Sequence, residues 1–182
     1  MSRLIPRLSM AELEPQLAEA LRPKVERLSY LGEFFQCTGH QPQALLSFHT
    51  LTEDLKQALP DNLTELVALS VAALMENAYE RVQHERLALK LGLSEAWVRA
   101  AVSLKAESGT HLSETELLVR RLALAIIERR GHDTEAELEA VVRAIGHKQA
   151  IAVLLLVGRY AMHALIANCL ALAPPVSSPL ES

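Results

Sequence analysis

One segment constrains the fold more than any other, because it is apolar nearly all the way round a helix. Residues 63–78 read LTELVALSVAALMENA, with Leu, Val and Ala at most positions. A helix of this kind has no face to offer water, so other helices must enclose it. Ala and Leu also dominate the rest of the chain, and β-branched residues are sparse, which favours helix over strand. The chain is therefore predicted to be all-α.

Capping residues, prolines and glycines divide the chain into about eight helices. Pro23 is predicted to separate two N-terminal helices, and Pro60 a third from the apolar segment. Ser113 with Glu116, and Thr134 with Glu137, are predicted to form capping boxes. The sequence contains no strong strand signal and no interdomain linker. We expect one domain over residues 1–182, with a core at about 41–173 and a flexible, proline-rich tail at 174–182.

Charge and cysteine content exclude several classes of protein. The net charge is −4 and no basic patch is present, so no nucleic-acid partner is expected. Two cysteines, Cys37 and Cys169, make neither a disulfide framework nor a metal knuckle. The first residues lack an uninterrupted apolar run, so no signal peptide is predicted and the expected compartment is the cytoplasm.

Residues 150–173 are long and apolar enough to imitate a membrane span. Arg159 and His163 fall in the middle of this segment, where a charge in lipid costs about 3 kcal/mol or more. We therefore expect a long helix buried among other helices, in part at a subunit interface, and no membrane partner.

The predicted helix at residues 76–92, ENAYERVQHERLALKLG, carries a carboxylate and an imidazole one turn apart. Glu80 and His84 are four residues apart, so they are neighbours on the helix surface. His84 shares its face with Leu87 and Leu91, which suggests that the pair runs into the apolar side. A nearby carboxylate favours imidazolium and burial opposes it, so the pair can donate or accept a proton near neutral pH. The alternative is an exposed ion pair worth about a few tenths of a kcal/mol.

Three further polar residues lie near this pair in the sequence, and each has two interpretations. Glu65 belongs to the preceding apolar helix, near its N-terminus, where a carboxylate is favoured in any case. Tyr79 is either a core aromatic residue or a hydrogen-bond donor to a substrate. Asn77 either caps the helix or contacts a substrate.

Residues 63–98 as a whole resemble the core of the carboxymuconolactone decarboxylase and alkyl hydroperoxidase D (AhpD-like) superfamily. The stretch LLLVGRYAMHALIAN, residues 154–168, resembles the last helix of that family and contains Arg159 and His163. The resemblance implies an AhpD-like all-α fold and a homo-oligomer, a trimer or a hexamer. The N-terminal helices exceed the minimal family core and can reshape or cover a pocket.

The chain departs from the family at the position that carries peroxidase chemistry. The peroxidase branch has the motif Cys-x-x-Cys-x-x-x-His, whose histidine corresponds to His84 and whose cysteines correspond to Asn77 and Glu80. A thiol peroxidase needs a reactive thiolate and a second thiol to resolve it. Cys37 and Cys169 lie outside the motif. Alkylhydroperoxidase activity of the peroxiredoxin type, which family membership would imply, stays as an alternative that the missing cysteines disfavour.

The decarboxylase branch lacks the cysteine pair, and its resemblance implies a carboxy-lyase that acts on a small carboxylated lactone from aromatic breakdown. Such a reaction needs a site for the carboxylate, an electron sink and an acid that protonates carbon. His84 paired with Glu80 would be the acid, and no cofactor is predicted. The predicted catalytic residues are His84, Glu80 and Glu65, and the predicted substrate-binding residues are Tyr79, Asn77, Arg159 and His163.

Two other interpretations remain open. Glu76, Glu80 and His84 occupy positions i, i+4 and i+8 and can bind a divalent cation, although no second histidine completes the set. The chain can also be a non-enzymatic helical oligomer that binds a small anionic ligand. A perturbed His84 pKa would favour an enzyme, and an ordinary one would favour the binding interpretation.

Overall fold

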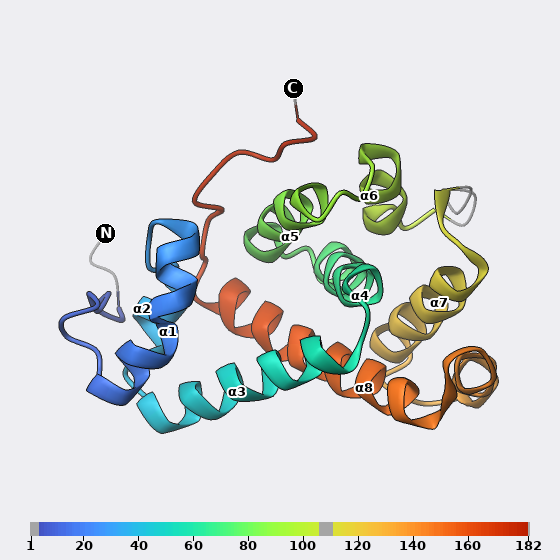
Figure 1. Ribbon diagram of the computed structural model, residues 1–182, viewed down its shortest axis with the longest axis horizontal. Helices are drawn as coiled ribbons and strands as arrows, with labels where there is room; N and C mark the ends of the chain where they lie inside the picture. The colour runs from blue at the N-terminus through green and yellow to red at the C-terminus, as the bar shows by residue number, and fades with distance from the viewer. Residues whose placement is uncertain (1–3, 106–110, 182) are drawn as a thin grey trace. The chain divides into compact units, whose positions relative to one another are not determined.

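The protein is all-helical, as its composition predicts. The computed structural model describes residues 4–105 and 111–181, and over these residues it contains eight helices and no strand (Figure 1). The helices are α1 (Pro15–Leu28), α2 (Glu33–Thr38), α3 (Pro42–Ala58), α4 (Asp61–Leu74), α5 (Ala78–Lys90), α6 (Glu95–Val102), α7 (Glu114–Glu128) and α8 (Glu135–Cys169).

The chain divides into two compact units, Met1–Glu53 and Asp54–Ser182. The expectation of a single domain over residues 1–182 therefore stays a prediction. In the first unit α1 continues through Pro23, where the sequence predicted a break between two helices. A proline removes one hydrogen bond from a helix but does not always end it. The helix ends instead at Ser29, which adopts a left-handed conformation with φ 66°.

The second unit is built around α4. Every residue from Leu63 to Ala72 is buried, and α4 packs against α5, α6, α7 and α8 (Figure 1). The central position predicted for this apolar segment is thus confirmed. The enclosure on all sides also means that a polar side chain on α4 must find its partner inside the protein.

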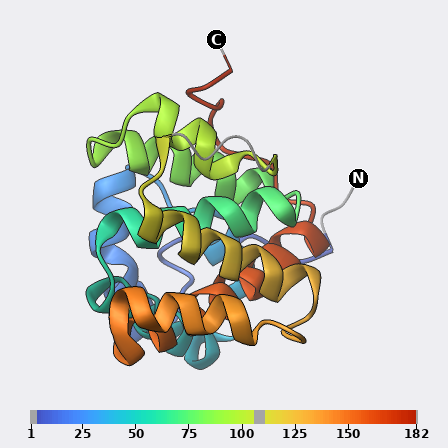
Figure 2. The same ribbon diagram turned by 90° about the vertical axis from the view of Figure 1, so that its right-hand side faces the viewer.

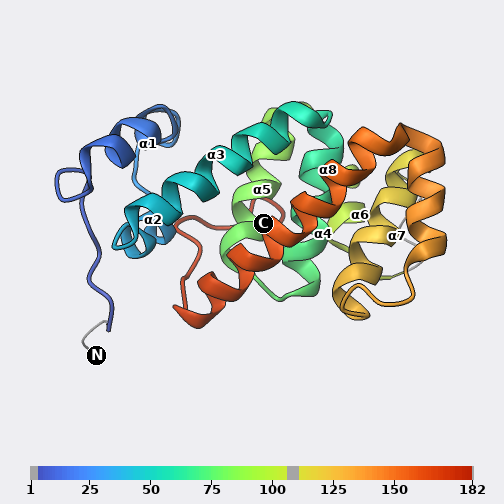
Figure 3. The ribbon, with the colours of Figure 1, turned by 90° about the horizontal axis from the view of Figure 1, so that it is seen from below.

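The longest helix, α8, changes direction at Gly146. This glycine has φ 78° and ψ 167°, a conformation that other residues rarely adopt. Figure 3 shows the two parts of α8 meeting at an angle, and Figure 2 shows α7 beside α8, against which it packs. By length and composition α8 could cross a membrane, but 56% of its most apolar window is buried inside the protein. It is a core helix of the second unit.

Two of the predicted helix starts form as expected and one does not. Asn77 caps α5 by accepting a hydrogen bond from the Glu80 amide, at 3.2 Å. Ser113 and Glu116 form the capping box of α7. Thr134 precedes α8 without capping it through its side chain, because its φ of −112° and ψ of 10° depart from the extended backbone usual at this position.

The flexibility predicted for residues 174–182 stays a prediction, and residue 182 lies outside the described residues, but the described part of the tail makes specific contacts. The Ser178 hydroxyl is buried and donates to Glu85 Oε2 on α5 at 2.6 Å. The composition of the tail could not predict this contact, because Ser178 and Glu85 are far apart along the chain.

Candidate active site

A buried histidine between two carboxylates forms the centre of the site. His84 Nδ1 donates to Glu65 Oε2 at 2.7 Å, and His84 Nε2 lies 3.4 Å from Glu80 Oε2. The side chains of His84, Glu65 and Glu80 are 11%, 3% and 9% exposed. Because Glu65 is on α4 and Glu80 on α5, the packing of these two helices assembles the group.

The last helix adds two basic residues on the far side of Glu80. Arg159 Nη1 donates to Glu80 Oε2 at 3.3 Å, and His163 Nε2 lies 3.2 Å from Glu80 Oε1. Arg159 and His163 are four residues apart on α8, so one face of the helix presents both. Each oxygen of the Glu80 carboxylate thus has a basic partner from α8.

Aromatic rings enclose this polar cluster. The Tyr79 and His163 rings are stacked with centroids 6.1 Å apart, and the edge of one ring meets the face of the other in the pair His84 and Tyr160, at 5.1 Å. The Arg159 guanidinium lies 4.3 Å from the centre of the Tyr160 ring. These rings limit the access of water, which strengthens the electrostatic interactions inside.

The charges of the cluster set the protonation state of its central members. Burial disfavours a charged His84, but the carboxylates of Glu65 and Glu80 outweigh burial and raise the pKa of His84 from 6.5 to about 9. Burial also disfavours a charged Glu80, but the neighbouring His163, His84 and Arg159 side chains hold the pKa of that carboxyl well below its usual value. At neutral pH the site therefore contains an imidazolium and an ionised glutamate.

Asn77 has a hydrogen-bonding group to spare. Its side-chain oxygen caps α5, which leaves the side-chain nitrogen to other partners. That nitrogen is buried and has no hydrogen-bond partner among the described residues. A buried donor without a partner is uncommon in proteins, so it marks a place where a ligand or a water molecule can bind.

The structure brings most of the predicted residues together but gives them different partners. Glu65, Glu80, His84, Arg159 and His163 form one cluster, and Tyr79 stacks on it. The sequence placed Glu80 as the main partner of His84, whereas the shorter contact is to Glu65.

Two residues near the site were missed by the sequence reasoning as functional candidates. Tyr160, which meets the His84 ring, adjoins Arg159 on α8, and this adjacency was the available signal. Glu85 is fully buried and bonds to Arg81 at 2.6 Å. Its signal was the four-residue spacing from Arg81.

The alternative metal site does not assemble around Glu76. This residue is exposed and precedes α5, with φ 52°. Among the described residues, no group of three or more His, Cys, Asp or Glu side chains is arranged to hold a metal ion. Cys37 is buried in α2 and Cys169 is exposed at the end of α8, so neither replaces the thiols missing from α5.

Two surface pockets lie away from this cluster. One is lined by α5 and the tail, and the other by α7 and the first part of α8. Neither contains Glu65, Tyr79 or His84 in its lining.

Comparisons with solved structures agree with the all-α, AhpD-like fold. The debrominase Bmp8 without ligand matches with a TM-score of 0.82 and 16% identity, over 97% of this chain and 94% of its own. A variant of Bmp8 in complex with 2,3,4-tribromopyrrole matches with a TM-score of 0.80 and 17% identity, over 94% and 91%. The AhpD core of an uncharacterized peroxidase-related protein from Ralstonia eutropha matches with a TM-score of 0.78 and 17% identity, over 93% and 90%.

Sequence comparison matches the middle of the chain to one family model. A profile of the Carboxymuconolactone decarboxylase family matches residues 42–116, which include Glu65, Glu80 and His84. No curated protein matches the sequence. Residues 42–116 thus match the model of the Carboxymuconolactone decarboxylase family, and the described helices share the fold of AhpD-like proteins.

Proposed function

We propose that this protein is a cofactor-independent carboxy-lyase that acts on a small carboxylated substrate by proton transfer from His84. The observation that carries the proposal is the position of the His84 ring, held between Glu65 and Glu80 and charged at neutral pH. A pKa of about 9 suits an acid that must arrive protonated, and it does not suit a base. The cytoplasm is the compartment we propose for this reaction.

The two ring nitrogens of His84 have different roles in this mechanism. Nδ1 is held by Glu65 at 2.7 Å, which fixes the orientation of the ring. Nε2 has the longer contact, 3.4 Å to Glu80, so its proton is in the weaker of the two hydrogen bonds and is the easier one to transfer. We assign proton delivery to Nε2, and Glu65 is a positioning residue.

The reaction breaks the bond between the substrate carboxylate and its carbon. The electron pair of that bond moves onto the carbon and the adjacent carbonyl, carbon dioxide leaves, and the Nε2 proton of His84 adds to the carbon. The side-chain nitrogen of Asn77, the Arg159 guanidinium and the His163 ring would stabilise the negative charge that develops on the carbonyl oxygen. The neutral histidine then regains a proton from water. Because the cluster is buried, side chains must move to admit the substrate, as happens in many enzymes.

The test is decarboxylation of carboxymuconolactone, followed as carbon dioxide release. In deuterated water we expect one deuterium in each product molecule, at the carbon that lost the carboxylate. His84→Gln should abolish turnover. Glu76→Gln, which removes a charge from an exposed carboxylate eight residues from His84, should leave turnover unchanged. An inactive wild-type protein, or an active His84→Gln variant, would overturn the proposal.

A second candidate is a non-enzymatic protein that binds a small anionic ligand. It is favoured by the internal pairing of the cluster, since Glu65, Glu80, His84 and Arg159 all have partners within the fold. Ligand binding without carbon dioxide release would support this candidate over the first.

We further propose that the protein forms a homo-oligomer, a trimer or a hexamer, through α8. Four large apolar residues of α8 are exposed: Ile151, Leu155, Met162 and Leu165. Their spacing places them on one stripe of the helix. Gly158 lies in the middle of the stripe with open space above it, so a second helix can approach closely there. A second copy of the chain, with the same stripe, is the partner that such a surface fits.

A further inference from the structure

The tail is fastened to α5 and α6, within the second unit, by hydrogen bonds of side chains. Ser178 Oγ donates to the buried carboxylate of Glu85 at 2.6 Å and accepts from the Leu180 amide at 3.1 Å. Arg99 Nη2 donates to the Leu180 carbonyl oxygen at 3.1 Å. These contacts hold the chain near Ser178 and Leu180 against α5 and α6.

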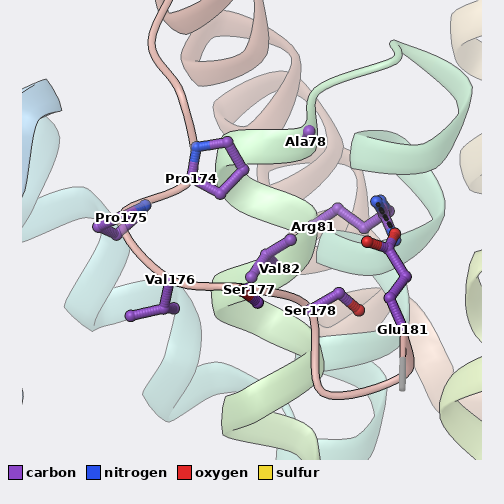
Figure 4. Close-up of a pocket in the computed structure, with 9 residues that line it drawn as sticks. All are labelled: Ala78, Arg81, Val82, Pro174, Pro175, Val176, Ser177, Ser178 and Glu181. Carbon is purple, nitrogen blue, oxygen red and sulfur yellow. Dashed lines mark hydrogen bonds and ion pairs between the residues drawn. The ribbon is translucent and has the colours of Figure 1, made fainter.

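A pocket of about 460 Å³ lies between this fastened tail and α5. Ala78, Arg81 and Val82 form its α5 side, and residues 174–178 with Glu181 form its tail side (Figure 4). Its volume is within the range of about 300–1,000 Å³ that is usual for small-molecule sites. Pro174 and Pro175 have restricted backbones, so this part of the wall loses little entropy when a ligand binds.

Arg81 supplies the positive charge of the pocket, and its two carboxylate partners differ in how deeply they are buried. Arg81 Nη1 donates to Glu85 Oε1 at 2.6 Å, and the Glu85 side chain is fully buried. Arg81 Nη2 donates to Glu181 Oε1 at 3.3 Å, and the Glu181 side chain is 69% exposed. The first contact is fixed. The second is long and solvated, so it adds little stability and exchanges easily.

We propose that this pocket binds a small organic monocarboxylate, which replaces Glu181 on the Arg81 guanidinium. The apolar body of the ligand would lie against Val82, Pro174 and Pro175. Replacement fits the charges better than addition, because an added ligand would place three carboxylates on one guanidinium. A guanidinium can donate two parallel hydrogen bonds to a carboxylate, and a swing of the Glu181 side chain would open one edge of the Arg81 guanidinium to the ligand.

This second site does not depend on the proposed decarboxylase activity. Residues 78, 81, 82 and 85 share one face of α5, and residues 80 and 84 lie on the adjoining face. Neither Glu80 nor His84 lines the pocket, because the His84 ring pairs with Glu65 whereas Arg81 pairs with Glu85 and Glu181.

The test is a titration of the isotopically labelled protein with benzoate, followed by backbone amide shifts. We expect saturable shifts at Arg81, Val82 and Ser177, and weaker binding of benzamide, which has the same shape without the charge. Glu181→Gln should tighten benzoate binding about two- to fivefold, because it removes the internal competitor. Glu128→Gln, the same charge change at an exposed position of α7, should have no effect.

Two further variants separate this site from the candidate active site. Arg81→Lys keeps a cation beside the buried Glu85 but loses the paired hydrogen bonds, so benzoate should bind more weakly to a folded protein. Glu80→Gln should leave the benzoate affinity unchanged when it is measured at the Ser177 amide, since Glu80 directly precedes Arg81 and its replacement alone alters the Arg81 amide shift. The proposal is wrong if Glu181→Gln binds benzoate as wild type does, or if the shifts fall only on residues outside the pocket.

Discussion

Replacement of Glu80 by glutamine tests the electrostatics of the site with the smallest change of shape. The substitution removes one negative charge and leaves an oxygen that can still accept a hydrogen bond. His84, Arg159 and His163 all lose the negative charge of the Glu80 carboxylate, from which they lie 3.4, 3.3 and 3.2 Å away. Glu65 keeps its contact with His84.

The distance between His84 and Glu80 sets the size of the effect. Two unit charges 3.4 Å apart attract each other by about 1 kcal/mol in bulk water and by about 5 kcal/mol at an effective dielectric constant of about 20. A change of about 1.4 kcal/mol alters an acid dissociation constant tenfold. In Glu80→Gln we therefore expect the pKa of His84 to fall from about 9 toward its ordinary value of 6.5.

Stability should fall as well. Arg159 is buried, and without a carboxylate its charge is no longer balanced. Loss of one partner from a buried ion pair costs roughly 3–5 kcal/mol. We expect a cost near the lower end, since the glutamine oxygen still accepts a hydrogen bond from Arg159. Urea denaturation at pH 7 measures this cost.

The assay for the pKa is an NMR titration of the histidine ring resonances. Glu76→Gln is the matched control, because it removes a carboxylate from an exposed position four residues away, and it should leave the His84 pKa near 9. If Glu80→Gln changes neither the His84 midpoint nor the affinity for a bound ligand, the pair is only a solvated helix contact and the site assignment is wrong.

Three other results are expected. The purified protein should not turn over alkyl hydroperoxides with any dithiol donor; robust turnover that a Cys37→Ser, Cys169→Ser double variant abolishes would contradict this. Light scattering at micromolar concentration should report an oligomer, which Leu155→Glu should dissociate, and a wild-type monomer would refute the proposed interface. Because the His84 pKa is raised from 6.5 to about 9, its contribution of about 3 kcal/mol to stability is complete below pH 6.5 and is lost as the pH rises through 9. Denaturation at pH 6 and pH 10 should show this loss in wild type and not in His84→Gln.

Local patterns predicted the parts of this protein that depend on neighbours along the chain. The all-round apolar character of residues 63–78 predicted a central helix, and α4 occupies that position. The capping residues Asn77 and Ser113 act within one turn of their own helices, so their roles were visible as well. Such features were predictable because each depends on a few adjacent residues.

One inference about His84 had the right outcome for the wrong reason. The sequence predicted a buried His84 because this residue shares a helix face with Leu87 and Leu91. Leu91 is 43% exposed. His84 is buried by its contacts with Glu65 on α4 and Tyr160 on α8. No periodicity in residues 76–92 carries that information.

The sequence by itself determined the helical class, the central helix and the spacing that makes Glu80 and His84 neighbours. Only the tertiary structure decided what this pair does. Glu65 is 19 residues from His84 and Arg159 is 79 residues from Glu80, so their meeting depends on how α4, α5 and α8 pack. The protonation of His84 follows from that packing, because a pKa responds to every charge within a few ångströms, whichever part of the chain supplies it.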